Sequence, residues 1–102
     1  MIVVIATVEL ATGQREAFLN EFHAIVPEVL EENGCIEYGP TVDIASGIDA
    51  QPPLRDNVVT IVEKWDSVAA LNAHNIAPHM QKYRERVKSM VEKTTLQVLE
   101  PA

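Results

Sequence analysis

Two stretches of the chain alternate with the two-residue period of a β-strand and are apolar on both faces. The first, residues 1–10, is rich in β-branched side chains. One of its faces carries Ile2, Val4, Ala6, Val8 and Leu10, and the other carries Val3, Ile5, Thr7 and Glu9. The second, residues 58–65, places Glu63 on the same face as Val59, Ile61 and Trp65. Both are therefore predicted to be strands that need cover on both sides.

An amphipathic helix is predicted over residues 14–33, where apolar positions recur at spacings of three and four. Its apolar stripe consists of Phe18, Phe22, Ile25 and Val29. Pro27 lies inside this stretch. It is expected to kink or split the helix, because proline lacks a backbone donor and clashes with the preceding turn. Asn33 and Gly34 then provide the stop signal.

The remaining elements follow from shorter patterns. Residues 35–43 alternate as a strand, with a bulge or an edge position expected at Gly39 and Pro40. A short helix is predicted over residues 68–75, and Pro78 opens a longer one. The apolar stripe of that longer helix is Met80, Tyr83, Val87, Met90 and Thr94. Residues 95–100 are predicted to be the last strand.

Residues 44–57 show no period and are predicted to form a loop. Loops of this length are often functional lids. We therefore expect this segment to be mobile and to border a binding pocket.

The order strand, helix, strand, strand, helix, strand predicts a ferredoxin-like α+β fold over a single domain, residues 1–102. Its four-stranded antiparallel sheet has both helical regions on one face. The other face, with residues such as Val3 and Ile5, would expose more apolar surface than monomers usually do. We expect a second copy of the sheet to cover it face to face, which makes the protein a homodimer.

The composition and charge of the chain limit the partners and the location that can be expected. The 102 residues include 47% hydrophobic side chains, enough for one core, and a formal charge of −7 would repel nucleic acid. No apolar run is long enough to span a membrane, and the first residues lack the features of a signal peptide. Cys35 is the only cysteine, so we expect a cytoplasmic protein. No glycine-rich loop follows a strand and no Cys-His cluster is present, so we expect no cofactor and no metal.

Four segments together resemble one known family. They are Glu32-Asn33-Gly34-Cys35-Ile36-Glu37-Tyr38, Ile61-Val62-Glu63-Lys64-Trp65-Asp66-Ser67, Leu71-Asn72-Ala73-His74 and Pro78-His79. Their order and spacing are similar to those of the antibiotic biosynthesis monooxygenase family. The resemblance implies a dimeric α+β barrel with a small-molecule pocket between the sheet and the helices of each subunit.

Members of that family include cofactor-independent oxygenases acting on quinols and anthrones, haem-degrading enzymes, and isomerases of small phosphorylated signalling molecules. Fold alone does not choose among these activities. The chain has Ala6 and Thr7 where the haem-degrading relatives place an asparagine, so haem degradation is not expected. Residues 44–57 are also longer than the connection common in the family.

His74 and Glu63 are the candidate catalytic residues. By resemblance His74 faces the pocket, where its imidazole could transfer a proton; the alternative is a histidine that only faces the helix dipole. Glu63 lies on a strand face expected to be buried, where desolvation would raise its pKa unless it finds a donor. We expect His74 to be that donor. The alternative places Glu63 at the dimer seam or beside Arg84 or Arg86.

Four further residues are candidate substrate contacts: Tyr38, Trp65, His79 and Tyr83. The indole of Trp65 could form the wall for a flat aromatic substrate, and the tyrosine hydroxyls could donate hydrogen bonds to a substrate oxygen. Core packing is the alternative for all three aromatic residues, and a hydrogen-bonded structural role is the alternative for His79. His74 and His79 are not expected to bind a metal, because Pro78 separates them and no third ligand is evident.

Three functions are compatible with these residues. The first is a cofactor-independent monooxygenase, in which His74 or Glu63 deprotonates a small quinol, phenolic or polyketide-like substrate that then reacts with molecular oxygen. The second is an isomerase or lyase of a small polar signalling metabolite, for which a phosphate would need a basic group such as Arg55 or Lys64. The third is a non-catalytic ligand-binding dimer.

Overall fold

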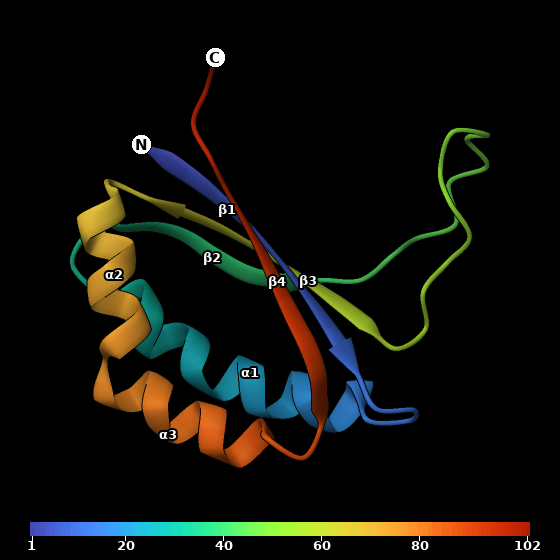
Figure 1. Cartoon of the computed structure of the whole chain (residues 1–102), viewed down its shortest axis with the longest axis horizontal. Coiled ribbons are helices and arrows are strands. Elements are labelled where there is room, and N and C mark those ends of the chain that lie inside the picture. The colour runs from blue at the N-terminus through green and yellow to red at the C-terminus, as the bar shows by residue number, and fades with distance from the viewer.

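The computed structural model describes all residues from 1 to 102. The elements in chain order are β1 (Ile2–Leu10), α1 (Arg15–Leu30), β2 (Cys35–Thr41), β3 (Val58–Trp65), α2 (Val68–Ile76), α3 (Pro78–Val87) and β4 (Val91–Leu99). The strands form one antiparallel sheet in the order β2-β3-β1-β4, and the helices lie on one side of it (Figure 1). This arrangement confirms the predicted ferredoxin-like α+β fold.

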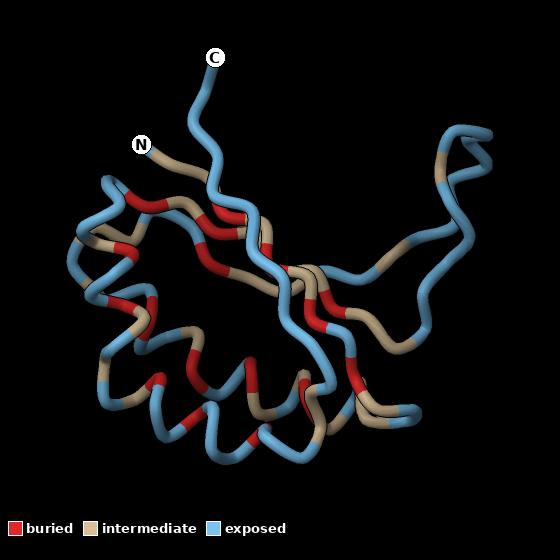
Figure 2. The backbone as a smooth tube through the Cα atoms, in the orientation of Figure 1, coloured by how far each residue is buried: buried red, intermediate tan, exposed pale blue.

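The core lies between the sheet and the helices because β1 and β3 turn matching faces toward α1. Strand pairing places Ala6 opposite Ile61 and Val8 opposite Val59, so the buried sets of the two strands form one surface. The predicted stripe of α1 covers this surface, and all of its members are buried: Phe18, Phe22, Ile25 and Val29. Figure 2 shows the buried positions on β1, β3 and the inner sides of the helices.

Two helix boundaries differ from the prediction. Pro27 lies inside α1, which continues without interruption to Leu30. The helix therefore does not split at Pro27. The second difference is at the C-terminal end of the chain: α3 ends at Val87, and β4 already begins at Val91. The expected helical stripe through Met90 and Thr94 was wrong there, because pairing with β1 outweighs the local three-four spacing.

Residues 42–57, here called the arm, project from the body of the fold between β2 and β3 (Figure 1). A bidentate contact holds its base, where the Arg55 guanidinium donates to both carboxylate oxygens of Asp43 at 2.8 and 2.9 Å. This hydrogen bond lowers the pKa of Asp43 to about 2. The apolar side chains of the arm are exposed: Ile44, Ile48 and Leu54.

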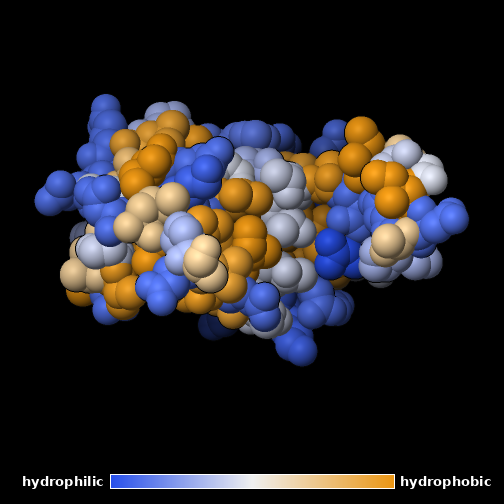
Figure 3. Space-filling model, turned by 90° about the horizontal axis from the view of Figure 1, so that it is seen from above, coloured by the Kyte–Doolittle hydropathy of each residue, from blue (hydrophilic) through white to orange (hydrophobic).

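The helix-free face of the sheet is only partly covered in the single chain. Val3, Ile5 and Thr7 of β1 are half-buried there, and almost all of β4 is exposed. Viewed from above, hydrophobic atoms occur both over the sheet and on the projecting arm (Figure 3). None of the three helices has the length and apolar character needed to cross a membrane.

Candidate active site

A cavity of about 430 Å³ lies between the helix-covered face of the sheet and α3. Its apolar wall includes Ala6, Val8, Phe18, Ile61, Val87 and Leu96. Its polar wall consists mainly of Tyr38, Glu63, His74 and Tyr83. A mainly apolar cavity of this size with a few convergent polar groups is typical of a small-molecule site.

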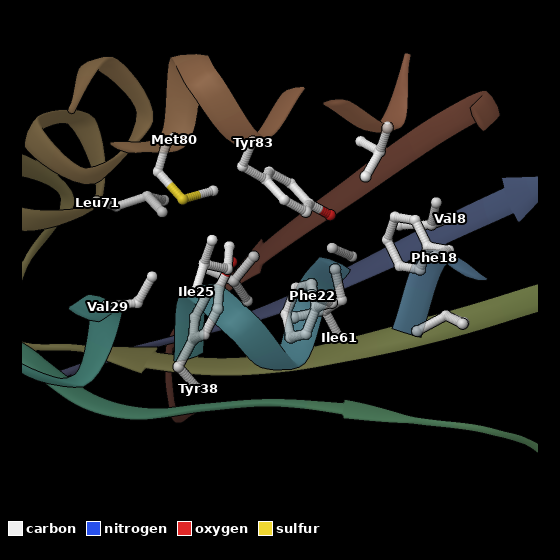
Figure 4. Close-up of a cluster of buried hydrophobic side chains, with 14 of the residues drawn as sticks. Val8, Phe18, Phe22, Ile25, Val29, Tyr38, Ile61, Leu71, Met80 and Tyr83 are labelled. Atoms are coloured by element: carbon white, nitrogen blue, oxygen red, sulfur yellow. The ribbon is translucent and has the colours of Figure 1, made fainter. Parts of the chain in front are cut away.

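Aromatic rings from three elements build one side of this cavity. Phe22 of α1 stacks on Tyr38 of β2, with ring centroids 5.2 Å apart, and meets Tyr83 of α3 edge-on at 6.0 Å. Phe18 contacts the same Tyr83 ring at 6.2 Å. Figure 4 shows these side chains between the sheet and the helices. The rings hold the two tyrosines in place at the cavity wall.

Glu63 is buried, with only 5% of the residue exposed. Its Oε1 accepts a hydrogen bond of 2.9 Å from the indole Nε1 of Trp65. Residues two apart on a strand share a face, so the alternation of β3 itself supplies the donor. Burial raises the pKa of Glu63 above its ordinary value, and the Trp65 hydrogen bond partly offsets that rise.

His74 lies in the last turn of α2 and is 3% exposed. Its ring packs against the indole of Trp65 at 4.7 Å and the ring of Tyr38 at 5.3 Å. Its Nδ1 is 2.9 Å from Oε2 of Glu32. Burial lowers the pKa of His74, and the hydrogen bond and negative charge of Glu32 partly offset that effect.

Glu63 and His74 therefore share one cavity, as expected, but the expected hydrogen bond between them was wrong. The alternatives for Glu63, a dimer-seam position or an arginine partner, were wrong as well, because Trp65 is its donor. The partner of His74 is Glu32, which sequence reasoning did not single out. The turn after α1 brings Glu32 there: a Cβ at Gly34 would lie 2.6 Å from Cβ of Ala70, so only glycine lets this turn approach α2 so closely.

Trp65 and His79 do not line the cavity. Trp65 is fully buried behind Glu63 and His74. His79 borders a separate surface hollow of about 400 Å³ between α1 and α3. Direct contact of these two side chains with a substrate in the cavity is therefore not supported: Trp65 lies behind Glu63, to which it donates, and His79 faces Glu32 and Glu28 outside the cavity wall.

Tyr38 and Tyr83 do line the cavity, and burial raises the pKa of both phenols. Both hydroxyls therefore remain protonated at neutral pH and can donate hydrogen bonds. No fully buried side-chain nitrogen or oxygen lacks a partner. Four cavity atoms without a partner in the chain thus keep accessible surface in the half-buried or buried residues of the site: both tyrosine hydroxyls, Nε2 of His74 and Oε2 of Glu63.

The arm does not line this cavity, so the expectation that residues 44–57 border the pocket is wrong for the single chain. Nor does the chain group three or more His, Cys, Asp or Glu side chains in a way that could hold a metal ion. The two phenols at the cavity can donate hydrogen bonds, and one imidazole and one carboxylate can transfer protons.

Replacing Trp65 by phenylalanine is expected to lower the free energy of unfolding by ~1–3 kcal/mol, because the buried Glu63 carboxylate loses its donor. The pKa of Glu63 should rise further, since the lost hydrogen bond favours the ionised form. Urea unfolding followed by circular dichroism measures the change, because the variant has no tryptophan left. Tyr38→Phe is the control, since the Tyr38 hydroxyl has no partner to lose. Equal stability of Trp65→Phe and wild type would contradict the role given to Trp65.

Comparison with known proteins shows the family to which this chain belongs. The family model described as antibiotic biosynthesis monooxygenase matches residues 1–86, and the chain belongs to this family. The chain is 43% identical over 103 aligned positions to a protein of Escherichia coli K12 named "Probable quinol monooxygenase YgiN", covering 99% of this chain and 98% of that protein. Family and relative together support a monooxygenase-type function.

Solved structures show the same fold. The structure of PA3566 from Pseudomonas aeruginosa matches with a TM-score of 0.80 at 23% identity, covering 99% of this chain and 93% of that one. A conserved protein from Methanosarcina mazei matches with a TM-score of 0.83 at 20% identity, over 99% and 92% of the two chains.

Proposed function

We propose that the protein is a cofactor-independent monooxygenase that oxidises a small quinol, phenolic or polyketide-like substrate in the cavity beside His74. The observation that carries the proposal is the contact of 2.9 Å between Nδ1 of His74 and Oε2 of Glu32. Its Nδ1 is held by Glu32, so the neutral ring has its lone pair on Nε2, which keeps accessible surface in a mostly apolar cavity. The identity with a relative named as a quinol monooxygenase supports this choice of substrate class.

His74 is the better base of the two candidates at neutral pH. Burial lowers its pKa, so the ring is neutral and ready to accept a proton. Glu32 stabilises the imidazolium that forms. Glu63, whose pKa is raised, can hold a second proton near the substrate. Tyr38 and Tyr83 donate hydrogen bonds to substrate oxygens in this proposal.

The reaction balances without an added reductant. A p-hydroquinone and dioxygen give a hydroxyquinone and water, and the substrate supplies every electron. His74 takes the proton of one phenol as the O–H bond breaks, which makes the ring electron-rich enough to react with dioxygen. One oxygen atom forms a new C–O bond, and the peroxide that results takes the proton held by His74. The C–H bond at that carbon and the O–O bond then break together and leave a carbonyl, and the departing hydroxide takes the C–H proton to leave as water. The apolar walls exclude solvent during these steps.

The cavity has few positively charged side chains that could bind the phosphorylated substrate of the isomerase alternative. A phosphorylated metabolite would need free cations beside it. Of the basic side chains only Arg84 and Lys88 reach the cavity, and the Arg84 guanidinium already donates to the backbone carbonyl of Asn75.

Burial raises the pKa of the Cys35 thiol to about 11, so this residue is a thiol rather than a thiolate nucleophile and suits a reducing cytoplasm.

Oxygen uptake by metal-free protein tests the proposal on a panel of hydroquinones, naphthohydroquinones and anthrones. Saturable uptake above the uncatalysed rate is expected for at least one class. The absence of uptake across the panel would contradict the proposal and favour ligand binding without catalysis.

We also propose that the active form is a homodimer. Leu99 of β4 is 45% exposed and lies opposite Val3 on the helix-free face of the sheet. Strand β4 is an outer strand of the sheet, and the neighbouring face of β1 is not covered by any helix. A second sheet packed on this face would bury Leu99 together with Val3 and Ile5 of β1.

Light scattering at micromolar concentration is expected to give twice the mass of the chain, because a stable interface of ordinary size holds at that level. Leu99→Lys should shift the mass toward that of the monomer, since a lysine cannot be buried there without a partner. Leu30→Lys, which introduces the same change at a 48% exposed position of α1, is the matched control. A monomeric wild-type protein would contradict the dimer.

A further inference from the structure

One carboxylate contacts the rings of two histidines in this chain. Oε2 of Glu32 lies 2.9 Å from Nδ1 of His74 and 2.8 Å from Nε2 of His79. The series of contacts continues from His79 toward the surface, because Nδ1 of His79 lies 3.2 Å from Oε2 of Glu28. The contacts form a continuous line from the cavity, through His74, Glu32 and His79, to Glu28 at the surface.

Burial changes steadily along this line. The side chain of His74 is 3% exposed, that of Glu32 14%, that of His79 20% and that of Glu28 60%. His74 borders the cavity, whereas His79 and Glu28 border the surface hollow between α1 and α3. Direct contacts between these side chains thus join the cavity to the surface hollow.

The contacts of the two histidines indicate where the charges lie. In His79, Nε2 is 2.8 Å from Oε2 of Glu32 and Nδ1 is 3.2 Å from Oε2 of Glu28, and an imidazolium is the form of the ring that both carboxylates favour. His74 has one carboxylate partner, at Nδ1, and the neutral tautomer protonated there satisfies it. Glu32 as an anion accepts from both rings. These contacts favour a resting state with negative charges on Glu32 and Glu28 and one positive charge on His79 between them.

We propose that Glu32 links the two histidines so that His79 releases a proton to the outer hollow when His74 takes one from the substrate. This inference rests on the proposed function of His74 as the base. The step conserves charge: the substrate O–H bond breaks and Nε2–H of His74 forms, while Nδ1–H of His79 breaks and the proton passes to Glu28 or water. The single positive charge beside Glu32 moves from His79 to His74. Reprotonation of His79 and loss of the His74 proton reverse the step.

The charged groups around the rings of His74 and His79 are compatible with this exchange of protons. The Glu32 carboxylate stabilises the imidazolium of His74, and the positive charges of His79 and Arg84 oppose it. Tyr38 and Glu63 also face His74 across the cavity, and the Tyr38 phenol is uncharged. Lys82 and Arg86 join Glu28 around the hollow beside His79, and Arg86 is bonded to Glu21. His79 is therefore the one opposing charge near His74 that can leave by losing a proton.

An NMR titration of His74 in the full protein, without substrate, tests the link. His79→Gln keeps a donor to Glu32 but removes the charge, so the His74 pKa should rise by roughly half to one pH unit. His23→Gln is the matched control on the exposed side of α1 and should leave the His74 pKa unchanged. Glu32→Gln should lower that pKa, and Glu31→Gln, the neighbouring exposed glutamate, should not.

Glu28→Gln is a second variant with little risk to folding, because it lies at the surface. It removes a carboxylate that holds His79 charged, so the His74 pKa should again rise. An unchanged His74 pKa in both His79→Gln and Glu28→Gln would overturn the proposal. These titrations need neither substrate nor oxygen. If they show the link while no substrate is oxidised, the proposed function fails and the coupling stands. In active enzyme, the acid limb of kcat/KM should move with the His74 pKa in His79→Gln.

Discussion

Replacing His74 by alanine is expected to lower kcat by about 100- to 10,000-fold on any substrate that the wild-type protein oxidises. The reason is the loss of the only neutral imidazole at the cavity wall, whose Nε2 lone pair accepts the substrate proton. Steady-state oxygen uptake at saturating substrate measures the effect. His23→Ala, which removes an exposed histidine of α1, should retain full activity.

The pH dependence of the wild-type enzyme follows from the same residue. The base works as neutral imidazole, and burial lowers the His74 pKa, so activity should be constant around neutral pH. It should fall only in acid, once the pH passes below that lowered pKa and the ring becomes protonated. A folded His74→Ala protein with undiminished kcat would exclude His74 as the base. Glu63→Gln would then have to abolish activity for the cavity to remain the site.

Replacing Phe22 by alanine is expected to cost ~3–5 kcal/mol in the free energy of unfolding. Phe22 is fully buried, and its ring is in contact with Tyr38 and Tyr83, so truncation leaves a void that two flanking rings cannot fill without moving. Urea unfolding monitored by Trp65 fluorescence, at one fixed protein concentration, gives the value. The control on the same helix is Leu30→Ala, which truncates a side chain that is 48% exposed and should cost far less. Equal losses for the two variants would contradict the assigned core.

Much of the fold is predictable from the sequence because β1 and β3 repeat every two residues and α1 every three to four. The two-residue period of β3 is enough to place Glu63 and Trp65 on its buried face. The end of α3 is not predictable in the same way. Positions such as Thr94 fit a helical spacing as well as a strand, and only pairing across the sheet, with Val8 opposite Thr94, decides between them.

The candidate site is predictable only in part. Residue type and face single out His74 and Glu63, but the partner of His74 lies 42 residues away along the chain. Glu32 follows the end of α1, where a glutamate usually faces solvent, and no periodic signal marks it. The available signal is Gly34: its positive φ of 87° and its close approach to Ala70 bring the turn against α2. Contacts of this kind depend on tertiary packing and leave no local pattern.

The central claim, that this protein inserts one atom of dioxygen into its substrate at the His74 cavity, is tested most directly by isotope labelling. Metal-free protein is supplied with a substrate that supports oxygen uptake and with isotopically labelled dioxygen, and the product is analysed by mass spectrometry. Each product molecule is expected to carry one labelled oxygen atom, with one dioxygen consumed per substrate, and both are expected to be lost in His74→Ala. A product without label, with hydrogen peroxide released instead of water, would contradict it.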